Sequence, residues 1–183
     1  MNKNLFLYFT AIFYAGLTLV ALILNRLLTG TYLPSPVVLS WEAAGLAVVA
    51  SGLMMAAVWL LVVLDLPFMG RIQEKLAQYQ PLLAGLSQSE RIYVSVLAGF
   101  SEELLFRGVL QPSWGIAVTS VVFGALHAVT FSYFLLATAV SFYLGWLFQY
   151  TGNLFVPMAA HALYDIFALN LLAWLNARDE LKR

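Results

Sequence analysis

Long apolar stretches separated by short polar ones dominate the chain, and each apolar stretch has the length of a membrane-spanning helix. A helix needs about 20 apolar residues to cross the hydrocarbon core of a bilayer. The segments between Lys3 and Arg26 and between Glu42 and Asp65 each contain 22 residues with no formally charged side chain. The same pattern, broken by turn residues, predicts four more helices over residues 90–110, 114–129, 133–150 and 154–176.

The most polar part of the chain, residues 67–90, separates the second predicted span from the third. Within it, residues 70–78 are predicted to form a short helix that lies in the membrane interface. Ser87 is followed three residues later by Glu90, which is the spacing of a capping box. We therefore expect the third helix to begin directly after Ser87.

Turn residues predict the other helix ends. The sequence Gln-Pro-Ser at 111–113 should end the third helix, and Ser113 should cap the fourth. Residues 130–132 form a weaker break between the fourth and fifth helices. Asn153 follows a Thr-Gly pair and should cap the sixth helix.

The composition indicates that these predicted helices belong to a membrane protein. The chain is 62% hydrophobic and only 10% charged, with a mean hydropathy of +0.87, whereas soluble domains are about a quarter charged. We expect an all-α, polytopic integral membrane bundle of about six transmembrane helices plus the short interfacial helix, surrounded by lipid. Residues 1–90 would supply two helices and the interfacial segment, residues 91–176 the core, and residues 177–183 a charged tail of this single membrane domain.

Charge and cysteine content exclude several functions and predict an orientation. The formal net charge is zero without a basic run, so nucleic acid is not an expected partner. The absence of cysteine excludes disulfides, thiolate zinc sites and a cysteine nucleophile. Basic residues in loops and tails favour a cytoplasmic position for both termini. Those predicted to be cytoplasmic are Lys3, Arg71, Lys75, Arg91, Arg178, Lys182 and Arg183, against Arg26 outside.

Three charged residues lie in the second half of the third predicted helix. Each costs about 2.5–3.5 kcal/mol at mid-bilayer if unpaired. Glu103 and Arg107 are four residues apart with the acid first, which favours a structural ion pair. Glu102 points about 100° away from Glu103 and has no partner on its own helix. It therefore needs a partner from another span.

The candidate partners are the two histidines of the chain, His127 and His161, together with Asp165, which lies one turn after His161. One possibility is that Glu102, assisted by His127, acts as a general base on water. His161 and Asp165 would then polarise the attacked carbonyl and stabilise its oxyanion. The other is that Glu102, His127 and His161 hold a zinc ion with an open position for water.

Three motifs together resemble those of the CPBP family of intramembrane proteases, also called the CAAX protease and bacteriocin-processing or Abi family. Residues 102–108, Glu-Glu-Leu-Leu-Phe-Arg-Gly, resemble its EExxxR motif, and Phe123 to His127 resemble its FxxxH motif. His161 to Asp165 resemble its HxxxN/D motif. All three occur in the family's order within residues 98–170.

This resemblance implies an endopeptidase of a bacterial cytoplasmic membrane, with a peptide or membrane-protein substrate. It implies that Glu102 and His127 activate water and that His161 and Asp165 form the oxyanion side, with Glu103, Arg107 and Phe123 in support. Asp165 stands where prenyl-protein-processing members have Asn, which can donate a hydrogen bond to an oxyanion. The family's names describe metalloproteases, but a metal-free glutamate mechanism is also argued, so the cofactor is either zinc or none.

Two other classes of function are compatible with the same residues. Buried Glu, His and Asp also serve proton- or ion-coupled transporters, although the chain lacks the internal repeat that many transporters have. A catalytically silent immunity or scaffold protein that binds a peptide is the third class. Retention of all three motifs disfavours it, since a silent protein would be free to lose Glu102.

Overall fold

In the computed structural model, the regular elements of the described residues are all helical. The structure describes residues 2–34, 36–64, 69–70, 72, 74–75 and 80–180. The predicted all-α membrane bundle is therefore confirmed. The elements are α1 (Lys3–Thr29), α2 (Trp41–Val63), α4 (Gln80–Ala84), α5 (Gln88–Glu103), the π-helix η1 (Leu104–Leu110), α6 (Gln111–Leu126), α7 (Phe131–Thr151) and α8 (Phe155–Glu180).

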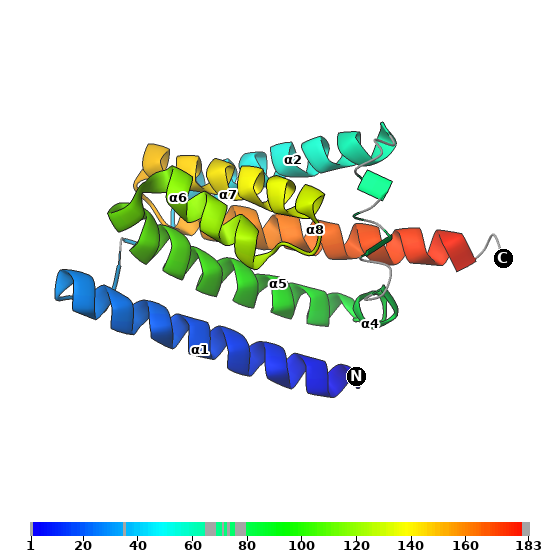
Figure 1. The fold of residues 1–183 in the computed structure, drawn as a ribbon, viewed down its shortest axis with the longest axis horizontal. Coiled ribbons are helices and arrows are strands. Elements are labelled where there is room, and N and C mark those ends of the chain that lie inside the picture. Colours follow the sequence, from blue (N-terminus) through cyan, green and yellow to red (C-terminus); the bar gives the residue numbers. More distant parts are fainter. Residues whose placement is uncertain are drawn as a thin grey trace.

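The long helices lie roughly along one axis, and their directions alternate in chain order, so that the neighbours α1 and α5 run the same way (Figure 1). The start of α1 and the end of α8 lie at the same end of the bundle, as expected if both termini are on one side of a membrane. Side-chain contacts agree with this alternation. Arg107 of η1 contacts Ser141 of α7. Gln111, four residues after Arg107, contacts Gly145, four residues after Ser141. Matching steps of four residues are the mark of two parallel helices.

Five helical stretches within the described residues are long and apolar enough to cross a membrane, and the third of them, Gln88–Leu126, is bent. Gly115 has φ 76° and ψ 163°, which breaks the helix. Beyond this break the chain turns back, and α6 runs beside α7 (Figure 1). The predicted fourth span is thus present as a helix of the bundle. Its part after the break, residues 116–126, is shorter than the roughly 20 residues that a full span needs.

The predicted end of the third helix was wrong. The helical backbone continues through residues 111–113, and Pro112 lies at the start of α6, where a missing amide donor is tolerated. Leu110 occupies the N-cap of α6 and no side chain caps that position, so the predicted cap by Ser113 was also wrong. The break falls at Gly115 because only glycine adopts its left-handed backbone conformation without strain.

The other predicted starts can be compared with the structure directly. The capping box before α5 is confirmed, with Ser87 Oγ accepting from Glu90 N and Glu90 Oε2 accepting from Ser87 N at 2.7 Å. Asn153 Oδ1 accepts from the amide of Phe155, the first residue of α8. Most of the predicted interfacial helix over residues 70–78 lies outside the described residues.

Close backbone contact between α5 and α8 sets the geometry of the bundle centre. Gly99 faces α8 so closely that a Cβ atom there would lie 2.7 Å from the carbonyl oxygen of Met158 and 2.8 Å from the amide nitrogen of Ala162. Small residues allow such approach in membrane bundles. The contact brings the last turn of α5, with its two glutamates, against the helix that carries His161 and Asp165.

Candidate active site

Glu102 lies in the last turn of α5, in the interior of the bundle, and only 7% of the residue is exposed. One carboxylate oxygen, Oε1, accepts a hydrogen bond of 3.1 Å from the hydroxyl of Tyr14 on α1. The other oxygen, Oε2, lies 3.6 Å from Nε2 of His127 at the end of α6. The partners of Glu102 thus come from two other helices, and one of these partners, His127, was predicted from the sequence.

Glu103 forms the core of a second, separate polar cluster. Arg107 Nη1 donates to Glu103 Oε1 at 3.2 Å, and Arg107 Nε lies 3.0 Å from Glu103 Oε2 in a close ionic contact. Both side chains are completely buried. Arg107 Nη2 also donates to the carbonyl and hydroxyl oxygens of Ser141. The pair predicted from the i, i+4 spacing is present, and it joins η1 to α7.

His161 lies between two carboxylates. Its Nδ1 is 2.7 Å from Glu103 Oε1, and its Nε2 is 3.5 Å from Asp165 Oδ2. The sequence analysis paired His161 with Asp165 as the side of the site that stabilises the oxyanion. The shorter contact with Glu103 means that the second glutamate of the motif holds the ring at Nδ1, so Glu103 has a partner beyond Arg107.

Phe123 packs against both histidines and the arginine. Its ring stacks on the His127 ring with centroids 4.2 Å apart, meets the His161 ring edge-on at 6.2 Å, and lies 5.2 Å from the Arg107 guanidinium carbon. Its backbone carbonyl oxygen is 2.8 Å from His127 Nδ1. A carbonyl can only accept, so Nδ1 carries a proton, and a neutral ring in this orientation would present the lone pair of Nε2 toward Glu102.

The arrangement of Glu102 and His127 therefore suits a bound water. A neutral Nε2 and a carboxylate oxygen are both acceptors, and 3.6 Å is too long for a direct hydrogen bond. A water molecule with its two protons can bridge two such groups. The His127 side chain is 33% exposed and the Asp165 side chain 29%, so these two side chains form the accessible part of the cluster.

The four predicted catalytic residues lie in two pairs, Glu102 with His127 and His161 with Asp165, and the ring of Phe123 packs against the histidines of both pairs. The sequence analysis did not identify Tyr14. A signal for it exists, because Tyr14, Thr18 and Asn25 are polar residues at helical spacing within an apolar span. Thr18 Oγ1 donates to Ser101 Oγ at 2.9 Å, and Asn25 is buried. This polar stripe marks the face of α1 that packs on the bundle.

The three residues proposed as zinc ligands do not form a metal site in this arrangement. His161 directs both ring nitrogens at carboxylates, so it has no free nitrogen for a metal shared with Glu102 and His127. In the described part of the chain, no three His, Asp or Glu side chains are placed to hold one ion. The donor set thus fits the zinc alternative poorly.

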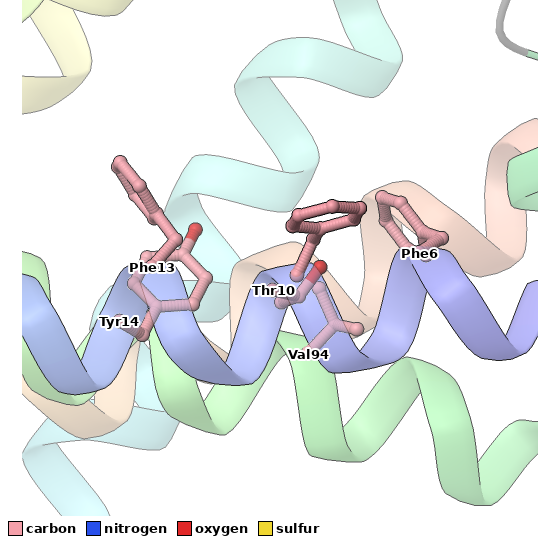
Figure 2. A pocket seen from close by; sticks show the side chains of 6 residues that line it. Phe6, Thr10, Phe13, Tyr14 and Val94 are labelled. Atoms are coloured by element: carbon pink, nitrogen blue, oxygen red, sulfur yellow. The ribbon is translucent and has the colours of Figure 1, made fainter. Parts of the chain in front are cut away.

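A hollow of about 300 Å³ lies between α1 and α5 next to the site (Figure 2). Its lining is mainly aromatic and aliphatic, from Phe6, Phe9, Thr10, Phe13, Tyr14 and Val94. Tyr14 thus has two environments, because its ring lines this apolar hollow while its hydroxyl contacts Glu102. A second hollow, of about 380 Å³, lies between α2 and α8 and is lined by Met55, Ala56, Trp59 and Phe167.

Comparisons with known proteins concentrate on the part of the chain that carries these residues. Residues 89–167 match the model of a family described as type II CAAX prenyl endopeptidase Rce1-like. A relative from Bacillus subtilis (strain 168), named uncharacterized protein YpbD, is 46% identical over 87 residues, which is 44% of this chain and 44% of the relative. The chain therefore matches less than half of that relative's length. No solved structure matches the chain.

Proposed function

We propose that this chain is an intramembrane endopeptidase of the CPBP family of CAAX-protease-like membrane proteins. The three motifs and the matching family model support a peptidase at the coarse level. The finer proposal is that it hydrolyses a peptide bond in a peptide or membrane-associated substrate, using water activated by Glu102 and His127. The observation that carries it is the pair of acceptors, Glu102 Oε2 and His127 Nε2, separated by 3.6 Å at the accessible edge of a buried cluster.

In the proposed reaction, Glu102 takes a proton from the water as the water oxygen attacks the carbonyl carbon of the scissile bond. His127 orients the same water through its Nε2 lone pair, with its ring fixed by Phe123. The carboxylic acid formed at Glu102 then delivers its proton to the leaving amine, so that the tetrahedral intermediate collapses to two peptide products. Every proton taken from the water is returned within one turnover.

The oxyanion of the intermediate is proposed to be stabilised by His161, with Asp165 beside it. The formal charges of Glu103, Arg107 and Asp165 sum to −1, which an imidazolium at His161 balances. In that form Nδ1–H donates to Glu103, and Nε2–H is available to Asp165 in the resting state and to the oxyanion during reaction. This arrangement does not need Asp165 to donate a hydrogen bond itself, so it accommodates the change from the family's Asn.

The test is cleavage of a quenched fluorescent peptide library by the purified protein in detergent and in proteoliposomes. Glu102→Gln should lower kcat by about 100- to 10,000-fold, because the base is lost while size and polarity are kept. His127→Ala and His161→Ala should also lose cleavage yet remain folded. Glu42→Gln is the matched control, since it makes the same chemical change at the exposed start of α2 and should keep full activity.

Adding a metal chelator separates the two mechanisms that the sequence left open. A water activated by Glu102 and His127 predicts an unchanged rate after chelation. Loss of activity with the chelator and its return with Zn²⁺ would contradict the metal-free step. Cleavage by Glu102→Gln at the wild-type rate would contradict the assignment of Glu102 as the base.

A further inference from the structure

We infer that Tyr14 is a positioning residue of the active site, supplied by a helix that lies outside the family-matched segment. This inference rests on the proposed role of Glu102. Tyr14 belongs to α1, whereas the family model matches residues 89–167. A complete site would then need α1 as well as the helices that carry the three motifs.

The two oxygens of the Glu102 carboxylate have different surroundings. Oε1 accepts from the Tyr14 hydroxyl at 3.1 Å, and Oε2 faces His127 Nε2 at 3.6 Å. Arg107, the cation on the same helix, is already bound to Glu103 and Ser141. A phenol donating to a carboxylate makes a charge-assisted bond that fixes the carboxylate's rotation. Tyr14 thereby keeps Oε2 turned toward His127 and the proposed water.

Two further contacts hold α1 in register with α5. Lys3 pairs with Glu90 at 3.1 Å near the start of both helices, and Thr18 donates to Ser101 one turn beyond Tyr14. Tyr14 lies between these contacts. Its hydroxyl is consequently placed by two fixed points of the α1–α5 interface, as a positioning group requires.

Tyr14 also lines the apolar hollow between α1 and α5. The labelled side chains of Figure 2 place Tyr14 beside Phe13 on α1, with Val94 of α5 facing the same hollow. Phe13 packs edge-on against the Tyr14 ring with centroids 5.2 Å apart. The ring is thus supported by apolar neighbours while only its hydroxyl enters the polar cluster.

Tyr14→Phe tests the role because it removes only the hydroxyl. We expect kcat for the peptide substrate to fall about 10- to 100-fold, which is the worth of one hydrogen bond to a charged group, with KM within twofold of wild type. Thr18→Val is the comparison variant, since it removes a hydroxyl bond from the same face of α1 but not from Glu102. It loosens one contact between α1 and α5, so kcat should fall by clearly less than in Tyr14→Phe. Tyr8→Phe repeats the chemical change at a residue that is 71% exposed and should have no effect.

A double-mutant cycle on thermal unfolding measures the contact without using activity. Tyr14→Phe and Glu102→Gln should be non-additive, whereas Thr18→Val and Glu102→Gln should be additive. Additive changes in the unfolding midpoint for Tyr14→Phe and Glu102→Gln would contradict the contact between these two residues. Equal loss of kcat in Thr18→Val and Tyr14→Phe would show a general effect of loosening α1 and would overturn the positioning role. If the double-mutant cycle shows coupling between Tyr14 and Glu102 but the wild type cleaves no peptide, the contact is supported, whereas the proposed function and the positioning role are both overturned.

Discussion

Replacement of Arg107 by methionine should lower the free energy of unfolding by about 3–5 kcal/mol, because it leaves a buried carboxylate without its cation. Neither Arg107 nor Glu103 has any exposed side-chain surface, and two nitrogen–oxygen contacts of 3.0 and 3.2 Å join them. Methionine fills much of the arginine's volume, so the cost comes from lost polar contacts more than from an empty cavity. The loss in the free energy of unfolding therefore measures mainly the cost of the buried Glu103 charge that remains.

The same replacement also removes the donor that serves Ser141. Arg107 Nη2 donates to the carbonyl of Ser141 at 2.7 Å and to its hydroxyl at 2.9 Å. A buried acceptor left without a donor costs about 1–3 kcal/mol, which is included in the range above. His161 remains at 2.7 Å from Glu103 and limits the loss.

The assay is reversible unfolding of the purified protein by denaturing detergent, followed by circular dichroism. Adding Glu103→Gln to Arg107→Met should restore part of the lost stability, because Gln is neutral and can still accept from His161. Arg26→Met, at the exposed end of α1, is the control and should change stability by about 1 kcal/mol at most, because Arg26 loses only its bond to the Gly30 carbonyl and its contact with the Tyr32 ring. Equal stability of Arg107→Met and wild type would refute the argument that this ion pair supports the bundle.

Gly99→Ala should cost about 1–3 kcal/mol, because its new Cβ would overlap backbone atoms of α8 and push the two helices apart. Gly16→Ala, whose Cβ would meet no atom within 4 Å, is the matched control, and equal unfolding midpoints for both would contradict the close approach. For orientation, single cysteines are informative because the wild type has none. An impermeant thiol reagent applied to intact cells should label Leu33→Cys and leave Gln88→Cys unlabelled; the reverse pattern would place the termini outside.

Local spacing predicted the contacts that lie within one helix, and tertiary contacts decided the rest. The Glu103–Arg107 pair and the Ser87–Glu90 capping box follow from intervals of four and three residues, and the structure has both. The Tyr14 contact joins residues 88 positions apart, and helical periodicity does not specify which helix an inward face meets. The spacing did indicate that Glu102 needed an external partner.

The end of the third helix was mispredicted for a different physical reason. Pro112 is a strong signal for a helix end, but it falls at the start of α6, where its missing amide donor does little harm. Gly115 was the weaker signal in the sequence, and its left-handed conformation makes the break. The π-helical geometry of residues 104–110 had no local signal that the sequence analysis used. Burial of almost every residue in this stretch shows that packing from several sides accompanies it.

The π-helix η1 makes the number of residues in this stretch as constrained as their identity. Its wider turn delays the rotation of every later side chain relative to a regular α-helix. Upstream of it, Ser101 and Glu102 face α1, and Glu103 faces α8. Downstream, Arg107 and Gln111 both reach α7. Adding or deleting one residue in between would turn one set against the other by about 100°. The direction of each side chain about the helix axis therefore depends on the length of this stretch, and a change in that length would misdirect residues that remain chemically unchanged.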